Sequence, residues 1–332
     1  MTRNEIWVYV ETENGSAKSV GYELLNAAKP IAYAKHAPLV AVVVGKNVRK
    51  AAEDAIGYGA DSAIILDGDE YAVYSTDAYT DALTELIRKY EPETLMLGAT
   101  VNGRDMAPRI ACRLETGLTA DCTDIGIDEG TGCVRWTRPT FGGNLMADII
   151  CPDKRPQMGT VRPGVFRKAA FDAGRTGKII EEDIHVSMQK IRTSVVKHIE
   201  EIAENVDLEG AEIIVAGGRG MGNAENFRIL EALADAVGGT VACSRPCADA
   251  GWLPRSRQIG QSGKTVSPKI YFAVGISGAV QHTAGMQGSG TIIAINNDPE
   301  APIFDIADYR IVGDLNTIVP VLTKKFLEFK KD

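Results

Sequence analysis

The sequence lacks the cysteine groupings that bind metal ions or exchange disulfides. Its six cysteines are scattered, and the closest two, Cys243 and Cys247, are four residues apart, so no C-x-x-C pair exists. Zinc ribbons, thioredoxin-like sites and iron–sulfur clusters all need closely grouped thiolates, which excludes these classes of site. We therefore predict no metal site, and we expect the scattered cysteines to be buried free thiols.

The sequence also lacks a surplus of basic residues and any long apolar run. The net charge is -8, whereas a surface that binds nucleic acid needs clustered positive charge. No uninterrupted apolar segment approaches the roughly 20 residues of a membrane span. Residues 1–11 lack the apolar core of a signal peptide. We predict a cytoplasmic protein that binds no nucleic acid and does not insert into a membrane.

Two common nucleotide-binding fingerprints are missing, although glycine is abundant. Residues 216–222 read AGGRGMG, which does not satisfy G-x-G-x-x-G in any register. Residues 260–265 read GQSGKT and end like a P-loop, but Gln258 stands where that motif needs its first glycine. A P-loop also connects a strand to a helix, whereas a strand pattern follows this segment. The sequence therefore predicts neither an ordinary nicotinamide site nor an ATP site.

The first half of the sequence alternates short apolar runs with helical patterns. Strand patterns lie at residues 6–10, 39–44, 62–66 and 94–98, and helical patterns lie at residues 22–34, 48–56 and 76–90. This alternation predicts a parallel sheet covered by helices. Three further strand patterns, at residues 133–139, 143–151 and 157–161, could extend that sheet or form an antiparallel flap on it.

A polar stretch at residues 172–206 precedes a second α/β pattern. In that second part, strand patterns lie at residues 212–216, 240–243, 269–274 and 291–295, with a helical pattern at residues 225–237. We predict an α/β protein of two domains, residues 1–195 and 207–332, with a linker near residues 190–206.

Polar loops marked by glycine follow the predicted strands of the second domain. Arg219 lies among glycines in the first loop, where its guanidinium would suit a phosphate. Ser244 and Arg245 end the next strand, and residues 258–268 form a loop rich in amides and hydroxyls. Taken alone, each segment is better explained as an ordinary turn or surface loop. Together they predict one long groove for a large anionic cofactor, because ligands bind at the carboxyl ends of parallel strands.

Residues 275–282 read as a strand end, a glycine turn and the start of a helix, which would present free backbone N–H groups to a diphosphate. His282, one of four histidines, is on this pattern alone as well explained by a structural role as by a functional one. Asn296 and Asp314 stand at strand ends, where they could contact a ribose or adenine, or simply form turns.

The order of these motifs resembles the alpha subunits of electron-transferring flavoproteins. The resemblance is carried in the second domain by GGRG, SRP, QIGQSGKTVSP, GISGAVQH, AINNDPEAPIF and GDL, beginning at residues 217, 244, 258, 275, 294 and 313. GRDMAPR at residues 103–109 and TGLTADC at residues 116–122 extend it to the first domain. It implies an N-terminal parallel-sheet domain of the nucleotide-hydrolase type and a C-terminal doubly wound FAD-binding domain.

The resemblance also implies which residues line the FAD. These are Arg219, Ser244, Arg245, Gln258, Ile259, Gly260, Gln261, Ser262, Gly275, Ile276, Ser277, Gly278, Ala279, Val280, Gln281, His282, Asn296, Asp314 and Leu315. Three of them would serve the redox chemistry. Arg245 would lie against the isoalloxazine ring, Ser262 would reach its N5, and His282 would lie near its C2 carbonyl, where positive charge favours a reduced, anionic flavin.

The family further implies a heterodimer with a beta subunit, packed against the N-terminal domain. In one branch, a second FAD in beta lets the complex split the electrons of NADH between a ferredoxin or flavodoxin and an acyl-CoA dehydrogenase. In the other, beta holds AMP and the heterodimer carries electrons from acyl-CoA dehydrogenases to a quinone reductase. RPTFGGN at residues 138–144 and TVRPGVF at residues 160–166 resemble the bifurcating and nitrogen-fixation-linked branch. Oxidoreductase activity is expected only in the complex.

Overall fold

A computed structural model describes residues 3–140, 145–186, 191–193, 208 and 210–329. The chain divides into two compact units, Met1–His198 (unit 1) and Ile199–Asp332 (unit 2). The predicted linker near residues 190–206 lies, apart from residues 191–193, outside the described residues.

Unit 1 contains a seven-stranded parallel sheet in the order β12-β5-β4-β1-β6-β11-β7. Its strands are β1 (Arg3–Val10), β4 (Leu39–Gly45), β5 (Ser62–Asp67), β6 (Pro92–Gly98), β7 (Leu118–Cys122), β11 (Gln157–Val161) and β12 (Lys178–Glu181). The connecting helices are α1 (Ser19–Ala34), α2 (Arg49–Gly57), α3 (Thr76–Tyr90) and α4 (Val101–Leu114), with the 3-10 turn η1 (Asp69–Tyr71). A small hairpin, β2 (Thr12–Glu13) and β3 (Ser16–Ala17), follows β1.

Both faces of this sheet are buried, which explains the continuous apolar runs in the sequence. Side chains alternate between the faces with a period of two. Ile6 and Val8 of β1 therefore join the core under α1 and α2. Trp7 and Tyr9 join the core under α3 and α4. The predicted parallel sheet covered by helices is confirmed for unit 1.

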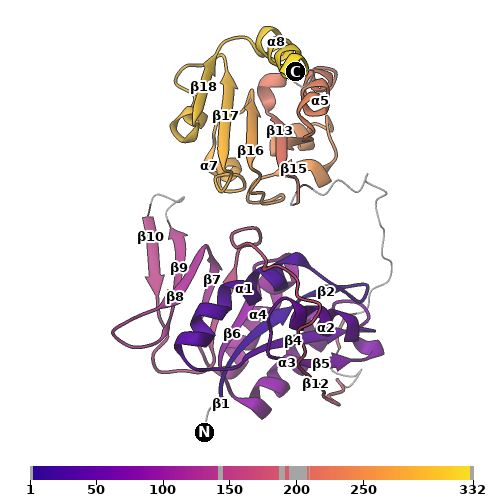
Figure 1. Ribbon diagram of the computed structural model, residues 1–332, viewed down its shortest axis with the longest axis vertical. Coiled ribbons are helices and arrows are strands. Elements are labelled where there is room, and N and C mark those ends of the chain that lie inside the picture. Colours follow the sequence, from indigo (N-terminus) through magenta and orange to yellow (C-terminus); the bar gives the residue numbers. More distant parts are fainter. Residues whose placement is uncertain (1–2, 141–144, 187–190, 194–207, 209, 330–332) are drawn as a thin grey trace. The chain divides into compact units, whose positions relative to one another are not determined.

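The middle segment combines both arrangements that the sequence allows. β8 (Asp124–Ile127), β9 (Val134–Thr140) and β10 (Leu145–Ile149) form a separate antiparallel sheet, drawn beside the main sheet in Figure 1. β11, in contrast, inserts between β6 and β7 of the main sheet. β12 also joins the main sheet as its edge strand, although it comes from the polar stretch in which no strand is predicted.

Unit 2 contains a six-stranded parallel sheet in the order β15-β14-β13-β16-β17-β18. Its strands are β13 (Ile213–Gly217), β14 (Thr240–Ser244), β15 (Gln258–Ile259), β16 (Ile270–Val274), β17 (Thr291–Asn296) and β18 (Tyr309–Val312). The chain winds outward from β13 through β14 to β15, then returns beside β13 with β16. This is the doubly wound order, so the predicted fold class is confirmed.

The two faces of this second sheet are covered differently. α5 (Phe227–Val237) and α8 (Leu315–Phe329) pack together on the face that carries Val215 and Phe272 (Figure 1). The opposite face carries Ala216 and Tyr271. Shorter elements follow the strands elsewhere: α6 (Arg245–Asp249), α7 (Val280–Thr283), and the 3-10 turns η4 (Arg219–Met221), η5 (Arg255–Arg257) and η6 (Pro302–Ile306). Most of these short elements lie at the carboxyl ends of strands, which leaves room for a cavity there.

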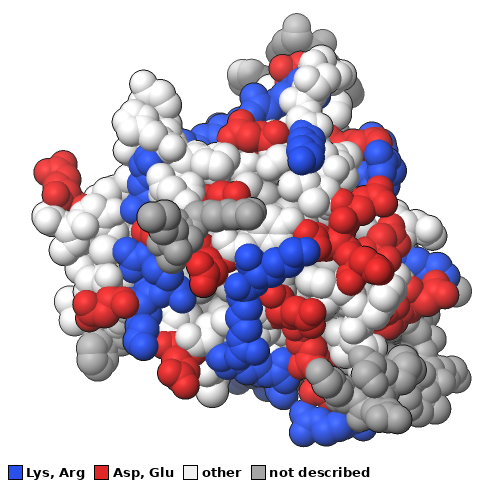
Figure 2. Space-filling model, turned by 90° about the horizontal axis from the view of Figure 1, so that it is seen from below, with Lys and Arg blue, Asp and Glu red and all other residues white. Residues whose placement is uncertain are grey.

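The face of the molecule in Figure 2 shows acidic and basic side chains lying beside one another. Several form ion pairs on the surface of unit 1, for example Arg175 with Asp61 and Lys50 with Asp54. Within the described part of the chain, no helix has both the length and the apolar character needed to cross a bilayer.

Candidate functional site

Unit 2 contains a cavity of about 630 Å³ at the carboxyl ends of its strands, within the roughly 300–1,000 Å³ common for ligand and cofactor sites. β14, β15 and β17 contribute residues to it, and so do the loops that follow β13 and β16, so the cavity lies on both sides of the point where the strand order reverses. The lining residues are Arg219, Gly220, Ser244, Arg245, Pro246, Ile259, Gly260, Gln261, Ser262, Gly275, Ile276, Ser277, Ala279, Gln281, His282, Asn296, Asp298, Ala301 and Pro302. The groove predicted from the sequence is therefore formed within one unit.

The loops that follow β13 and β16 both line the cavity, and their backbones are in contact. The N–H of Gly218 donates to Val274 O at 2.9 Å, and the N–H of Gly220 donates to Gly275 O at 3.0 Å. A β-carbon added at Gly218 would lie 2.2 Å from Gly275 O, so no larger residue fits there. These glycines allow the close approach of two loops, which explains the glycine-rich pattern without G-x-G-x-x-G.

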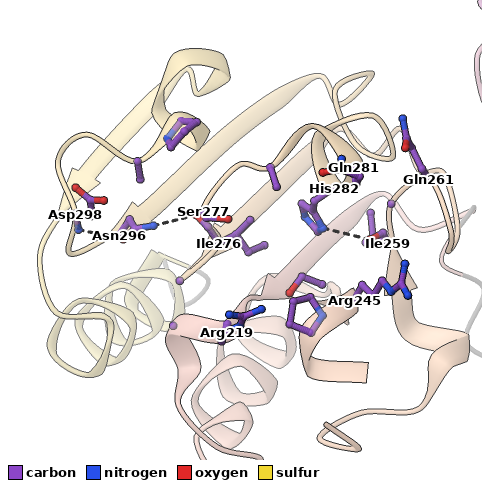
Figure 3. A pocket seen from close by; sticks show the side chains of 18 of the residues that line it. Arg219, Arg245, Ile259, Gln261, Ile276, Ser277, Gln281, His282, Asn296 and Asp298 are labelled. Atoms are coloured by element: carbon purple, nitrogen blue, oxygen red, sulfur yellow. Dashed lines mark hydrogen bonds between the residues drawn. The ribbon is translucent and has the colours of Figure 1, made fainter. Parts of the chain in front are cut away.

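Two arginines bring positive charge to the cavity. Arg219 begins η4 directly after β13, and Arg245 begins α6 directly after β14. Figure 3 places both along the same side of the cavity. The Arg245 side chain is 67% exposed, and its Nε lies 3.2 Å from Oδ2 of Asp249, whose Oδ1 lies 3.3 Å from Arg255. Arg245 therefore keeps most of its guanidinium accessible to a ligand.

The loop after β15 is held by hydrogen bonds from a side chain and from its backbone. Gln258 Nε2 donates to Ser262 Oγ at 3.0 Å, and the N–H of Gln261 donates to Gln281 O at 2.7 Å. Gly260 has φ +139°, a conformation that residues with a β-carbon rarely adopt. Gln258 does not line the cavity itself but fixes the hydroxyl of Ser262, which does.

His282 is buried beside the cavity, with 7% of its surface exposed. Its Nδ1 lies 3.2 Å from Ile259 O, a contact drawn in Figure 3, and its Nε2 lies 3.0 Å from the hydroxyl of Tyr271. Burial lowers the pKa of His282 to about 4, although the hydrogen bond to Ile259 acts in the opposite direction. The imidazole is therefore neutral near pH 7 and supplies no net charge.

The far end of the cavity is organised by Asn296. Its Nδ2 donates to Ile276 O at 2.9 Å, and its Oδ1 accepts from the N–H of Asp298 at 3.0 Å (Figure 3). Asp298 lines the cavity, although no role is predicted for it from the sequence. The same is true of four further residues: Gly220, Pro246, Ala301 and Pro302. All five lie inside the motifs that carry the family resemblance, so those motifs could have identified them from the sequence.

Fourteen of the predicted residues line the cavity, and five do not. Besides Gln258, these are Gly278, Val280, Asp314 and Leu315. Asp314 accepts from the N–H of Asn316 at the start of α8, and Leu315 is buried in the core beside α5. Gly278 packs against the backbone of Ile303. In the structure, Asp314 thus forms a turn, whereas Leu315 and Gly278 have packing positions.

The helix predicted to begin near residue 280 is a single turn, α7. A helix dipole arises from aligned peptide units and is small in one turn. The expected contribution of a helix terminus to binding a diphosphate is therefore weak. The guanidiniums of Arg219 and Arg245 are the stronger groups for an anion.

The lining groups suit a dinucleotide with a flat ring system. Arg219 and Arg245 can pair with phosphates or other negative charge. Three hydroxyls, of Ser244, Ser262 and Ser277, can donate to ligand atoms, while the side chains of Ile259, Ile276 and Pro246 offer apolar surface. Among the residues that the structure describes, no group of three or more His, Cys, Asp or Glu side chains could hold a metal ion.

Two family models match the chain. The one described as "Electron transfer flavoprotein domain" covers residues 6–187, and the one described as "Electron transfer flavoprotein FAD-binding domain" covers residues 207–287. The second match includes the loops after β13, β14, β15 and β16. Unit 2 therefore carries an FAD-binding domain of this type.

Relatives match the chain along almost its full length. The electron transfer flavoprotein subunit alpha of Thermoanaerobacterium thermosaccharolyticum is 50% identical, over 98% of each chain. The acryloyl-CoA reductase electron transfer subunit beta of Anaerotignum propionicum is 43% identical, over 98% of this chain and 96% of the relative. Protein FixB of Bradyrhizobium diazoefficiens is 43% identical, over 97% of this chain and 88% of the relative.

Proposed function

The chain belongs to the electron transfer flavoprotein alpha-subunit family, and from this premise we propose that it carries electrons through one FAD bound in the cavity of unit 2. It does so as one half of an obligate heterodimer with a beta subunit. The observation that supports this most directly is the convergence of five strand ends of the FAD-binding domain on one cavity containing two arginines.

The residues of the cavity have separate tasks in this proposal. Bound FAD supplies reversible electron transfer at its isoalloxazine ring. Arg219, with the backbone of the loop after β13, would pair with the diphosphate. Arg245 would lie against the ring, where a guanidinium would favour negative charge. Ser262, whose hydroxyl accepts from Gln258, would donate to the ring.

His282 belongs to the site in this proposal, but it does not act as a charged group. Its two ring nitrogens contact Ile259 and Tyr271, and its imidazole is neutral near pH 7 because burial lowers its pKa. The fixed positive charge beside the ring therefore comes from Arg245. Its partner Asp249 also contacts Arg255, so the negative charge of that carboxylate is shared.

Co-expression with the beta subunit tests this proposal. The purified heterodimer should be yellow, should bleach on reduction, and should retain FAD when unit 2 is intact. Replacing Arg219 and Ser277 together by alanine should release the unit 2 flavin while leaving the heterodimer assembled. A colourless heterodimer that binds only AMP or ATP would instead identify a nucleotide-binding regulator.

We further propose that the heterodimer bifurcates electrons from NADH between a ferredoxin or flavodoxin and an acyl-CoA dehydrogenase. The motifs at residues 138–144 and 160–166 support this branch, and so do the names of two relatives, an acryloyl-CoA reductase electron transfer subunit and a FixB protein. Residues 141–144 lie outside the described residues. The alternative is a simple carrier between acyl-CoA dehydrogenases and a quinone reductase.

Counting cofactors separates the two branches. Two FAD per heterodimer would favour bifurcation, whereas one FAD and one AMP would favour the simple carrier. A kinetic measurement complements the count. In a bifurcating complex, oxidation of NADH should require both the low-potential acceptor and the acyl-CoA dehydrogenase with its enoyl-CoA substrate. Oxidation that proceeds at full rate with either acceptor alone would contradict bifurcation.

A further inference from the structure

A wholly buried tyrosine lies behind His282 and does not reach the cavity. Tyr271 belongs to β16 and has 0% of its surface exposed. Its hydroxyl lies 3.0 Å from His282 Nε2, and the two ring centroids are 6.3 Å apart. Tyr271 is not among the cavity-lining residues, whereas His282 is. The hydroxyl of Tyr271 can therefore act on a bound cofactor through its hydrogen-bond partner His282.

The contacts of the imidazole determine which nitrogen carries the proton. A backbone carbonyl can only accept a hydrogen bond, so Nδ1 of His282 must donate to Ile259 O. In the neutral ring Nε2 is then the acceptor, and the hydroxyl of Tyr271 is its donor. The reverse tautomer would leave the buried Nδ1 facing the carbonyl oxygen with no proton between them, which is repulsive.

This tautomer also ties together two segments that line the cavity. The bond from His282 Nδ1–H to Ile259 O joins α7 to the end of β15, where the loop of residues 259–262 begins. The N–H of Gln261 joins the same two segments by donating to Gln281 O. A β-carbon added at Gly260 would lie 2.7 Å from Gln281 O, so the two backbones are already in close contact. The loop held in this way carries Ser262.

We propose that Tyr271 is a positioning residue of the flavin site: its buried hydroxyl holds His282 as the neutral Nδ1–H tautomer, which fastens the Ile259–Ser262 loop to α7. The consequence for the flavin site rests on the proposed function, whereas the tautomer can be measured in the chain itself. His282 then acts by holding the shape of the site, and it stays uncharged.

The hydroxyl of Tyr271 can be separated from the packing of its ring. The ring belongs to the core that also contains Ile259, Ala273 and Met286. Tyr271→Phe keeps this ring and removes only the hydroxyl, so a role limited to packing predicts a silent substitution. Tyr79→Phe is the matched control, because Tyr79 is 5% exposed and its hydroxyl also makes one hydrogen bond, at 2.7 Å to Tyr71 O, in unit 1.

The test is ¹⁵N NMR of histidine-labelled heterodimer, recorded with FAD bound and after its removal. The chain has four histidines, and a His282→Asn sample identifies the His282 signals by difference. In the wild type at pH 7, Nδ1 should be protonated and Nε2 unprotonated. Tyr271→Phe should raise the population protonated at Nε2 about two- to tenfold, the range expected for one lost hydrogen bond.

A second measurement follows the cofactor. The FAD dissociation constant of Tyr271→Phe should rise by a similar two- to tenfold, and Tyr79→Phe should change neither quantity. A wild-type His282 that is charged or protonated at Nε2 overturns the proposal, as does a Tyr271→Phe spectrum identical to the wild type. A heterodimer without FAD in unit 2 would overturn the proposed function, while the tautomer would still be read from the spectrum.

Discussion

Arg245 and His282 line the same cavity but contribute differently because their surroundings differ. Arg245 stands at the start of a short helix with two-thirds of its side chain exposed, so most of its guanidinium is accessible to a ligand. His282 is buried between Ile259 and Tyr271, and among the residues that the structure describes no acidic side chain contributes to the shift of its pKa. Burial without a neighbouring negative charge favours the neutral imidazole. The positive charge of the site therefore comes from arginine.

Replacing Arg245 by alanine should leave FAD bound and lower the potential at which it is reduced. Removing a fixed positive charge beside the ring should weaken the negatively charged reduced form about three- to tenfold, where tenfold corresponds to about 1.4 kcal/mol. Potentiometric titration measures this shift. Arg255→Ala is the matched control, since Arg255 pairs with the same Asp249 but does not line the cavity. Equal shifts in both variants would contradict the placement of Arg245.

Unit 2 should become less stable in mild acid because of His282. Burial lowers the pKa of this imidazole to about 4 in the folded chain, and the unfolded value is about 6.5. The unfolded chain therefore takes up the proton first as the pH falls. The free energy of unfolding of unit 2 therefore keeps its full value above about pH 6.5. It falls as the pH is lowered from 6.5 towards 4, by at most about 3 kcal/mol.

Urea unfolding followed by flavin fluorescence, at several values between pH 7 and pH 4.5, measures this loss. The His282→Gln variant should show a shallower decline, because it has no imidazole to protonate. His185→Gln, in unit 1, should keep the wild-type decline. Parallel curves for the wild type and His282→Gln would show that His282 does not cause the loss.

At the scale of elements, the site depends on loops that touch through their backbones. α7 and the loop after β15 approach so closely that a β-carbon at Gly285 would lie 2.5 Å from the nitrogen of Gly260 and 2.6 Å from its Cα. Backbone atoms cannot move aside as a flexible side chain can. The two segments can therefore be separated by adding a single methyl group.

Gly285→Ala should push the loop after β15 away from α7 and weaken FAD binding about tenfold or more, since one disturbed contact of this kind costs roughly 1–3 kcal/mol. Equilibrium dialysis of the heterodimer against FAD measures this change. Gly130→Ala is a suitable control, because its β-carbon would meet only Asp128 Oδ2, at 3.5 Å. Unchanged FAD affinity in Gly285→Ala would show that the loop can relax without cost.

Element prediction succeeded where one physical signal dominated. Continuous apolar runs such as residues 39–44 identified strands buried on both faces, and β4 spans Leu39–Gly45. β12 was missed because two of its four residues, Lys178 and Glu181, are exposed and only its pairing with β5 makes it a strand. α4 was not predicted as a helix because it contains Gly103 and Pro108, residues that lower helix propensity.

At the scale of the whole molecule, the sheet of unit 1 and both of its hydrophobic cores are formed by residues of unit 1 alone. Its last described contact is made by Arg192, whose guanidinium and backbone N–H donate to Asp77 in the first turn of α3. Hydrogen bonds from Arg192 lower the pKa of the Asp77 carboxyl to about 2. Residues after β12 therefore still belong to unit 1.

A fragment of residues 1–193 should fold and bind no FAD, because the cavity residues all lie in unit 2. A fragment of residues 1–190 should fold less stably, since it leaves the Asp77 carboxylate without Arg192. A loss of about 1 kcal/mol would lower the melting temperature by about 2–4 °C in a domain of this size. Circular dichroism on heating compares the two. Flavin retained by either fragment, or equal melting temperatures, would contradict this division.

The sequence by itself determined the family, the α/β class and the segments that form the cavity. Fourteen of the predicted residues line it, because glycines and polar groups at the ends of apolar strands must lie at one edge of a parallel sheet. These are local signals, read from neighbouring residues. The motifs GGRG and GISGAVQH carried this information although no standard fingerprint was present.

Only the tertiary structure decided the state of individual groups within that cavity. Tyr271 and His282 are 11 residues apart, and Ile259 lies 23 residues before His282, yet their contacts fix the tautomer and the charge of the imidazole. The sequence leaves Asp314 open as a ligand or a turn residue, and in the structure its side chain accepts a hydrogen bond at the start of α8. Burial and hydrogen-bond partners arise from the packing of distant segments, so a protonation state cannot be read from a motif.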